Sequence, residues 1–302
     1  MIGVFDSDHG GLTILRSLVT ALPQRSFVYL CDHAHAPYGE RSSAEIVDLT
    51  RNAVEMLFDI ECDLVVLACN TAAAVALRTL QQEWLPVEYE DRRILGVLVP
   101  TVEAVTGVPW LIDPARVPAG RAQERAKTIA VFATRRTVES NAYPEEVDKR
   151  ASGIDLIQVA CEGLVDLIER HAPRDVLRDA VHGYVGQLMG RLDSKRSGGK
   201  RLDAVLLGCT HYPLVADLFA EALPAGVEIL SQPDLVARSL ADYLVRHEDL
   251  DAADFRGGTL KLLTTGDPDH VSKFATDFFG RPIRFESVGT RSRSRSVAGQ
   301  VA

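Results

Sequence analysis

A unit made of an apolar strand, a cysteine and a helix occurs twice in this chain of 302 residues. Asp63-Leu-Val-Val-Leu-Ala-Cys69 leads into the helix-forming residues 72–80, and Asp203-Ala-Val-Leu-Leu-Gly-Cys209 leads into residues 212–219. Both copies place an Asp six residues before the Cys and a small residue immediately before it. The repetition predicts two related lobes, each presenting one sulfur to a shared cleft.

The composition argues against several classes of protein. A formal net charge of -9 is unlike that of a nucleic-acid coat. The apolar runs are strand-length, far below the roughly 20 residues of a membrane span, and the strand-like start at Ile2–Phe5 does not resemble a signal peptide. The five cysteines are odd in number and irregularly spaced, unlike a disulfide framework. We therefore expect a cytoplasmic protein with free thiols and with no membrane or nucleic-acid partner.

Short apolar strands alternate with helical segments along the chain. The predicted strands are Ile2–Phe5, Ser26–Leu30, Leu64–Ala68, Arg93–Val99, Thr128–Phe132, Ile154–Ala160, Ala204–Leu207 and Thr259–Thr264. The predicted helices are Leu12–Val19, Ser43–Phe58 with a Ser N-cap, Leu164–Glu169, Ser239–Val245 and Val271–Phe279. This alternation predicts an α/β fold with two pseudo-symmetric lobes, each a mostly parallel sheet flanked by helices, and an active site in the cleft between them.

The two lobes are expected to divide the chain unevenly. Residues 1–98 and 238–288 are predicted to form the first lobe and residues 99–237 the second. Residues 108–125, rich in Pro, Gly and Ala, are expected to be a loop insertion. Residues 194–200 are predicted to form a flexible basic loop, and residues 289–302 a disordered tail.

Polar residues and a thiol follow the predicted strands of the first lobe. Parallel sheets bind ligands beyond the carboxyl ends of their strands. Asp6, the loop of residues 31–39 and Cys69 all fall at such ends. We therefore expect these residues to face one site.

The position of the two repeated cysteines suggests acid/base chemistry. A thiol at the start of a helix lies in the positive end of the helix dipole, which lowers its pKa from about 8.5. The backbone N–H groups of Asn70-Thr71 and of Thr210-His211 are expected to be helix-start donors for a substrate carboxylate. Because two opposed units give access to both faces of one carbon, they favour inversion by a pair of acid/base groups.

The sequence also bears on other possible roles of the cysteines. Cys31, Cys62 and Cys161 are predicted to be small buried hydrophobic residues. No CxxC or HxxxH spacing is present, so the sequence predicts no metal site. A redox pair is compatible with two thiols, but the spacing does not indicate one.

Four separated stretches resemble, in order, the signatures of the glutamate racemase family. They are Phe5-Asp6-Ser7-x-x-Gly10-Gly11-Leu12-Thr13, Pro37-Tyr38-Gly39-Glu40-Arg41-Ser42, Ala68-Cys69-Asn70-Thr71-Ala72 and Gly208-Cys209-Thr210-His211-Tyr212-Pro213-Leu214. Residues 133–143, 164–169 and 264–268 add weaker matches, so the similarity covers about residues 1–288.

The resemblance implies a cofactor-independent homodimeric isomerase that interconverts L- and D-glutamate and supplies D-glutamate for peptidoglycan. It implies that Cys69 and Cys209 are the two bases, that Asp6 assists Cys69, and that His211, with Glu169 nearby, assists Cys209. The residues implied to contact the amino acid are Ser7, Pro37, Tyr38, Gly39, Asn70, Thr71, Thr134, Thr137 and Thr210.

The chain departs from the family pattern at a few positions. Asp8-His9 stands where most members carry Gly and a small apolar residue, and Glu162 stands where Pro is usual. His33 and His35 stand where Thr and a non-His residue are usual.

Two other functions stay open at this point. Asp6 and Asp8 resemble the DxD turn of haloacid-dehalogenase-type phosphatases, with Asp6 as nucleophile, Asp8 as acid/base and a magnesium ion. Asp267 and Asp269 would supply the distal acidic motif of that reading, which leaves both cysteine units unexplained. The third candidate is an amino-acid-binding protein that keeps the cleft without turnover.

Overall fold

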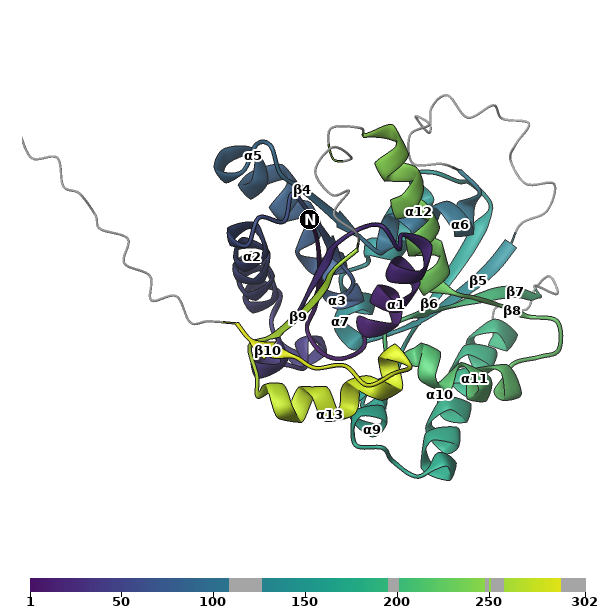
Figure 1. The fold of residues 1–302 in the computed structure, drawn as a ribbon. Coiled ribbons are helices and arrows are strands. Elements are labelled where there is room, and N and C mark those ends of the chain that lie inside the picture. The colour runs from purple at the N-terminus through teal and green to yellow at the C-terminus, as the bar shows by residue number, and fades with distance from the viewer. Residues whose placement is uncertain (109–126, 195–200, 248–249, 251–257, 289–302) are drawn as a thin grey trace, which may run out of the picture.

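The computed structural model describes residues 1–108, 127–194, 201–247, 250 and 258–288. Its strands are β1 (Ile2–Asp6), β2 (Phe27–Cys31), β3 (Leu64–Leu67), β4 (Arg93–Gly96), β5 (Lys127–Ala133), β6 (Ile154–Ala160), β7 (Leu202–Gly208), β8 (Glu228–Leu230), β9 (Leu260–Thr264) and β10 (Glu286–Ser287). They form two sheets, with the orders β10-β9-β2-β1-β3-β4 and β6-β5-β7-β8 (Figure 1).

The helices connect these strands. The α-helices are α1 (Leu12–Ala21), α2 (Ser43–Asp59), α3 (Asn70–Val75), α4 (Leu77–Thr79), α5 (Leu85–Glu88), α6 (Leu98–Thr106), α7 (Arg135–Glu139), α8 (Ala142–Asp148), α9 (Leu164–Glu169), α10 (Arg174–Ser194), α11 (Ala216–Ala222), α12 (Gln232–Arg246) and α13 (Pro268–Phe279). The 3-10 segments are η1 (His33–His35), η2 (Tyr38–Glu40) and η6 (Tyr212–Val215), and a π-helical turn η3 spans Leu80–Trp84.

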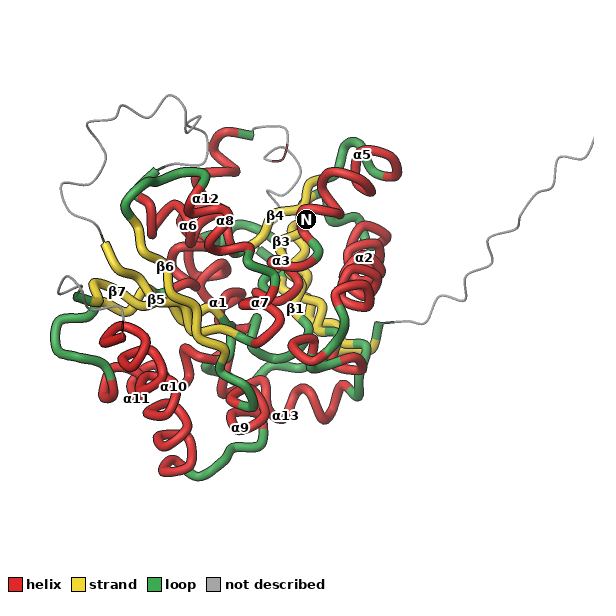
Figure 2. Tube along the Cα trace, turned by 180° about the vertical axis from the view of Figure 1, so that it is seen from behind, coloured by secondary structure: helices red, strands yellow, loops and turns green. Residues whose placement is uncertain are grey.

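Each pair of neighbouring strands is parallel, as the alternation of strands and helices predicted. The central strand β1 is buried along its whole length, which is typical of a parallel sheet covered on both faces. Helices α2 and α5 lie beside the first sheet and α10 and α11 beside the second, while α1, α6 and α12 lie between the two (Figures 1 and 2). The predicted α/β fold with two parallel sheets is therefore confirmed.

The register brings the carboxyl ends of neighbouring strands to one level. In the first sheet Asp6 pairs with Cys31. In the second sheet Ala133 pairs with both Ala160 and Gly208. The residues that follow these strands therefore lie side by side at the carboxyl end of each sheet.

The predicted start of the second helix is confirmed by a capping box. Ser42 accepts a hydrogen bond from the N–H of Glu45, and the Glu45 side chain accepts one from the N–H of Ser42. This arrangement satisfies two N–H groups that a helix start leaves unpaired.

The predicted strand at Arg93–Val99 is too long. Strand β4 ends at Gly96, and helix α6 has already begun at Leu98. Pro100 lies in the first turn of α6, where its missing N–H costs no helical hydrogen bond. The helix predicted at Ser239–Val245 is longer than expected and begins at Gln232.

Apart from Val108 and Ser194, the predicted insertion, basic loop and tail lie outside the described residues. Strands β1 to β4, β9 and β10 fall within residues 1–98 and 238–288, and strands β5 to β8 within residues 99–237. The boundary predicted at residue 238 falls inside α12. Within the described part of the chain, no helix has the length and apolar character needed to cross a membrane.

Candidate active site

The carboxyl ends of both sheets open into one cavity with a volume of about 190 Å³. Residues from the ends of strands β1, β3, β5, β6 and β7 contribute to its wall. The lining residues are Asp6, Ser7, Asp8, Pro37, Tyr38, Gly39, Glu40, Cys69, Asn70, Thr71, Thr134, Arg135, Cys161, Glu162, Gly163, Val165, Asp166, Cys209, Thr210 and His211. The two cysteines of the repeated unit therefore share one pocket, although they come from different sheets.

Twelve of the fourteen residues expected at the site line this cavity. The other two, Thr137 and Glu169, lie behind the wall and contact residues that form it. Thr137 is fully buried, and its hydroxyl lies 3.4 Å from that of Thr71. Glu169 contacts the wall residue His211 directly and lies one further contact, through His9, from the wall residue Asp8.

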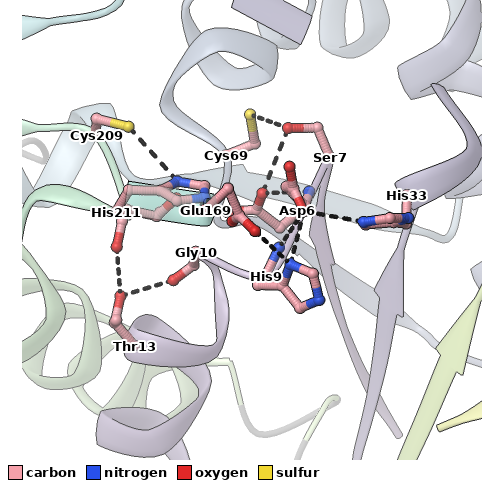
Figure 3. A network of polar contacts seen from close by, with 12 residues as sticks. Asp6, Ser7, His9, Gly10, Thr13, His33, Cys69, Glu169, Cys209 and His211 are labelled. Atoms are coloured by element: carbon pink, nitrogen blue, oxygen red, sulfur yellow. Dashed lines mark hydrogen bonds and ion pairs between the residues drawn. The ribbon is translucent and has the colours of Figure 1, made fainter. Parts of the chain in front are cut away.

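Ser7 links Cys69 to Asp6 (Figure 3). The Ser7 hydroxyl donates to Asp6 Oδ1 over 3.4 Å and lies 3.3 Å from the sulfur of Cys69. Because the hydroxyl proton goes to Asp6, the Cys69 thiol can donate its own proton to Ser7 Oγ. The three side chains form a path for a proton between the pocket and a buried carboxyl group.

The environment of Cys69 differs from the expected one. Cys69 is the N-cap of α3, and the N–H of Ala72 donates to its sulfur over 3.5 Å. Burial, together with the nearby Asp6 carboxylate, nevertheless raises the pKa of Cys69 to about 12. The prediction that the helix start lowers this thiol pKa is wrong, because desolvation disfavours the thiolate more than the six-residue helix favours it.

Asp6 is a buried carboxyl group with several donors around it. Its Oδ1 accepts from the N–H of Asp8 over 2.9 Å, and its Oδ2 accepts from the Thr210 hydroxyl over 3.2 Å. Burial raises the pKa of Asp6 to about 6, although His211 and the Asp8 N–H act in the opposite direction. A carboxyl group with this pKa can exchange a proton near neutral pH.

The second cysteine unit is built differently from the first. Thr210 and His211 lie in a turn, and a 3-10 segment starting at Tyr212 separates Cys209 from α11. The prediction that Thr210-His211 supplies helix-start N–H donors is therefore wrong. His211 instead places its Nδ1 3.8 Å from the sulfur of Cys209.

Glu169 holds the far side of the His211 ring. His211 Nε2 and Glu169 Oε1 are 2.5 Å apart. Burial opposes the charged form of His211, but its hydrogen bonds with Cys209 and Glu169 raise its pKa well above the usual value. Burial likewise opposes ionisation of Glu169, yet hydrogen bonds from His211 and His9 hold the pKa of that carboxyl well below its usual range. The charges of the two side chains stabilise each other.

Hydroxyl groups join the two halves of the pocket. Thr71 on α3 lies 3.0 Å from Thr134, the N-cap of α7, and Thr134 lies 3.1 Å from Thr137, measured between their hydroxyl oxygens. Each hydroxyl can donate and accept, so the cluster can reorient toward a substrate carboxylate.

Asn70 is fixed by a buried network that the sequence did not predict. Its Nδ2 donates to Gln232 over 2.7 Å, and its Oδ1 accepts from the Tyr143 hydroxyl over 2.7 Å. Gln232 is an unremarkable polar residue at the start of α12, so only the three-dimensional structure reveals its role.

Tyr38, Pro37 and Gly39 bring the loop after β2 to the pocket. The Tyr38 hydroxyl donates to Asp32 over 2.6 Å, so this side chain presents its ring rather than a free hydroxyl. Asp32 also accepts from Thr265 over 2.7 Å and lies 2.8 Å from Nδ1 of His35. His35 therefore supports the loop from its outer side.

Several wall residues were not expected at the site. Cys161, predicted to be structural, lies on the wall, whereas Cys31 and Cys62 are buried away from it as expected. The unexpected charged wall residues are Asp8, Glu40, Arg135, Glu162 and Asp166. Glu40, Arg135 and Glu162 are exposed, whereas Asp8 is buried. Their positions in loops and short helices gave no periodic signal in the sequence.

Two groups of side chains near the pocket have donor atoms close enough for a cation. The possible ligand atoms of Asp8, His9 and His33 lie within 4.8 Å of one another, as do those of Asp8, Glu169 and His211. In both groups hydrogen-bonded His–carboxylate pairs already occupy donor atoms. The structure does not favour the phosphatase alternative. Asp267, its proposed distal acidic residue, instead caps α13 by accepting from the N–H groups of Asp269 and His270.

Comparison with known proteins identifies the family. The chain is 45% identical over 289 residues to a glutamate racemase from Phenylobacterium zucineum. The aligned region covers 94% of this chain and 99% of that protein. The chain belongs to the glutamate racemase family. No protein-family model matches it.

Solved glutamate racemases share this fold. A glutamate racemase isoform from Bacillus anthracis has a TM-score of 0.79 at 26% identity, covering 95% of this chain and 96% of the other. The Thermus thermophilus enzyme, solved with beta-chloro-D-alanine, has a TM-score of 0.73 at 29% identity, with 95% of each chain covered. The glutamate racemase resemblance inferred from the four motifs is thereby confirmed.

Proposed function

We propose that this chain is a cofactor-independent isomerase that interconverts L- and D-glutamate with two cysteines, Cys69 and Cys209. The observation that carries the proposal is that these two buried thiols, one from each sheet, open into the same pocket. Membership of the glutamate racemase family supports glutamate as the substrate. Inversion at Cα requires that one group removes a proton from one face while another adds a proton to the opposite face.

The surroundings of the two cysteines favour one direction of proton transfer, from the substrate to Cys209 and from Cys69 to the substrate. A thiol with a pKa of about 12 is protonated at neutral pH, so Cys69 is set to donate. The raised pKa of His211 favours its charged form, and its Nδ1 lies 3.8 Å from the sulfur of Cys209, so this sulfur is placed to accept a proton. The Cα proton passes to the sulfur of Cys209, and the Cys69 proton passes to the opposite face of Cα. The enzyme is then left with the protonation needed for the reverse reaction.

The surrounding groups support a carbanion-like state. The Cα–H of an amino acid is a very weak acid, so a desolvated site must offer preorganised donors. The first N–H groups of α3, at Asn70 and Thr71, have no acceptor within the helix and suit the α-carboxylate. The residues proposed to contact the substrate are Ser7, Pro37, Tyr38, Gly39, Asn70, Thr71, Thr134, Thr137 and Thr210, with Thr137 acting through Thr71 and Thr134.

The family also motivates proposals about the whole protein. We infer a cytoplasmic homodimer that supplies D-glutamate for peptidoglycan. We also infer two lobes, one formed by residues 1–98 and 238–288 and the other by residues 99–237. The strands of each sheet fall within one of these two sets of residues, which supports the division.

A single assay tests the reaction. The protein is incubated with L-glutamate, and separately with L-aspartate, in D2O, and both optical rotation and Cα deuteration are followed. We expect L-glutamate to racemise with uptake of deuterium. Absence of exchange with either amino acid would overturn the proposal and leave the amino-acid-binding alternative.

The two-base mechanism is tested with serine variants. Cys69→Ser and Cys209→Ser are each expected to lower kcat by several orders of magnitude, because an alcohol is a far poorer base at neutral pH than a thiolate. Cys62→Ser is the matched control, since Cys62 is equally buried but lies outside the pocket. A Cys69 or Cys209 variant that racemises at the wild-type rate contradicts the mechanism.

A further inference from the structure

His9 lies beneath the pocket, in the turn between β1 and α1. Its side chain is 1% exposed and stacks on Phe278 of α13, with 5.7 Å between the ring centroids. Its Nδ1 lies 2.9 Å from Asp8 Oδ1 and 3.1 Å from Glu169 Oε2. The ring is therefore held between an aromatic surface and two carboxylates.

Glu169 is shared between two imidazoles. Its Oε2 faces His9 Nδ1, while its Oε1 faces His211 Nε2 at 2.5 Å. The other ring nitrogen of His211, Nδ1, faces the sulfur of Cys209 at 3.8 Å. A continuous chain of contacts thus runs from His9 through Glu169 and His211 to the second cysteine (Figure 3).

The chemistry of the carboxylate fixes where the protons lie. An ionised carboxylate only accepts hydrogen bonds, so both nitrogens that face Glu169 must carry hydrogen. For His211 this places hydrogen on Nε2 and directs Nδ1 to the sulfur of Cys209. For His9 it places hydrogen on Nδ1, between Asp8 and Glu169. Burial opposes the charge on His9, but the hydrogen bonds to the two carboxylates raise its pKa to about 9.

We propose that His9 is a positioning residue for the Cys209 half of the site, acting by fixing the Glu169 carboxylate in the orientation that holds His211 against Cys209. This inference rests on the proposed two-cysteine reaction. Without His9, Oε2 of Glu169 loses a buried donor, and the carboxylate is free to rotate away from His211. A side chain that binds one nitrogen of a reacting imidazole commonly sets the tautomer and the orientation of the ring.

The contact also joins the two sheets. His9 follows β1 of the first sheet, whereas Glu169 ends α9 and His211 follows β7 of the second. The alignment of His211 with Cys209 therefore depends on how the two sheets are seated on each other. The Cys69 half has its own partners, Ser7 and Asp6, neither of which contacts His9 in the bonds described above.

The His9 ring faces side chains from its own turn, from α9, from η1 and from α13. Asp8 comes from its own turn and Glu169 from α9. His33 of η1 lies edge-on with 5.1 Å between ring centroids. Helix α13 contributes Phe274 and Phe278. Among these, Glu169 connects His9 to His211 through hydrogen bonds, whereas Phe278 contacts both rings through packing alone, with 5.3 Å between its centroid and that of His211.

Two substitutions separate the hydrogen bond from the packing. His9→Phe keeps an aromatic ring on Phe278 and removes the donor, whereas His9→Asn offers an amide donor near the position of Nδ1. We expect His9→Phe to lower kcat/KM about 10- to 100-fold, as for loss of a hydrogen bond to a charged group. We expect His9→Asn to recover part of the loss. His33→Phe is the matched control, because His33 contacts the same ring without touching Glu169.

Isotope effects locate the defect in one half of the site. The two enantiomers have equal free energy, so kcat/KM stays equal in both directions for every variant. If transfer at Cys209 alone becomes slow, the primary effect of 2-deuterated glutamate on kcat/KM rises for the enantiomer that Cys209 deprotonates. It falls for the other enantiomer, because transfer at Cys69 then limits the rate less. A merely structural defect changes both effects in the same direction.

Several results would overturn the inference. They are wild-type kcat/KM in His9→Phe, an equal loss in His33→Phe, and equal isotope effects for both enantiomers. A wild-type protein that loses activity with a chelator and regains it with a divalent metal would show that a cation, not a proton, joins these groups. Failure of the wild type to racemise glutamate would instead refute the proposed function itself.

A measurement on the wild type keeps the inference testable if His9→Phe does not fold. Long-range ¹H–¹⁵N NMR spectra of the histidine rings report which nitrogen carries hydrogen. We expect His9 Nδ1 and His211 Nε2 to be protonated at pH 7. An unprotonated nitrogen at either position would contradict the shared carboxylate.

Discussion

The hydroxyl of Ser7 lies 3.3 Å from the sulfur of Cys69 and donates its proton to Asp6. Burial raises the pKa of Cys69 to about 12, so any thiolate formed there depends on its few donors. When the thiol proton moves through Ser7 to Asp6, the Ser7 hydroxyl can turn its hydrogen toward the sulfur and donate to the thiolate, and the N–H of Ala72 is another donor. The serine is therefore both a proton path to Asp6 and a stabiliser of charge on the sulfur.

Replacement of this serine tests both roles. Ser7→Ala is expected to lower kcat about 10- to 100-fold, because a hydrogen bond to a charged group contributes about 1.5–3 kcal/mol. Steady-state kinetics in both directions measure the loss. Ser7→Thr, which keeps the hydroxyl, is the control and should retain more activity than Ser7→Ala. Equal kinetics in Ser7→Ala and wild type would show that Cys69 does not use this path.

Gly10 allows the β1–α1 turn to approach the second cysteine unit. A Cβ at this position would overlap the Thr210 hydroxyl and the ring of His211. Gly10→Ala is therefore expected to displace His211 from Cys209 and to reduce kcat about 100-fold or more, as misplacement of reacting groups by about 1 Å can do. Kinetics combined with a thermal melt separate this effect from unfolding.

Helix α10 offers a matched control for that substitution. A Cβ on Gly183 meets no other atom within 4 Å. Gly183→Ala should leave kcat unchanged and stabilise the helix by about 0.5–1 kcal/mol. Normal activity in Gly10→Ala would contradict the close approach.

The two cysteine units illustrate how far the sequence alone can lead. Their strands were predictable, because an apolar run of strand length between polar residues has few alternatives. The local structure after each cysteine was not, since a helix begins at Asn70 but a turn and a 3-10 segment follow Cys209. Pro213 lies within this segment, and the packing of Gly10 against Thr210 and His211 is a contact between distant parts of the chain.

Contacts between distant residues also account for what was missed at the site. The motifs identified Asp6, Cys69, Cys209 and His211, because those residues have recognisable neighbours in the sequence. The link from His9 to Glu169 spans 160 positions, and that from Asn70 to Gln232 spans 162. The helix-dipole argument for Cys69 failed for a related reason, since its burial depends on the whole pocket wall.

Titration of His9 should be visible in the pH dependence of stability. Its pKa is about 9 in the folded protein, above the value of about 6.5 for an unperturbed histidine. The folded state binds the proton more tightly, so this stabilisation is complete below about pH 6.5 and is lost as pH rises through 9. The wild type should thus lose more stability between pH 6 and pH 9.5 than His9→Phe.

Urea denaturation at several pH values measures this difference. The comparison of variant with wild type removes contributions common to both proteins, such as the raised pKa of Asp6. His182→Phe is the control for loss of a histidine, because His182 is about half exposed on α10. Parallel pH profiles for wild type and His9→Phe would contradict a protonated His9.

The network behind Asn70 should respond unequally to the loss of its two partners. Tyr143→Phe removes a hydroxyl, but Asn70 Oδ1 still accepts from Gln232 over 3.0 Å. Gln232→Leu also removes the acceptor of Asn70 Nδ2 and leaves a buried donor unpaired. We expect Tyr143→Phe to lower the free energy of unfolding by about 1 kcal/mol and Gln232→Leu by about 1–3 kcal/mol. Both should raise KM, because Asn70 lines the pocket.

A surface tyrosine provides the control for these measurements. Tyr184 donates to the carbonyl oxygen of Glu162 over 2.6 Å at an exposed site, so water can replace the bond in Tyr184→Phe. The free energy of unfolding of this variant should lie within about 0.5 kcal/mol of that of the wild type. If Gln232→Leu is no less stable than Tyr143→Phe, the unpaired amide of Asn70 must find another acceptor. The network then supports Asn70 through packing rather than through hydrogen bonds.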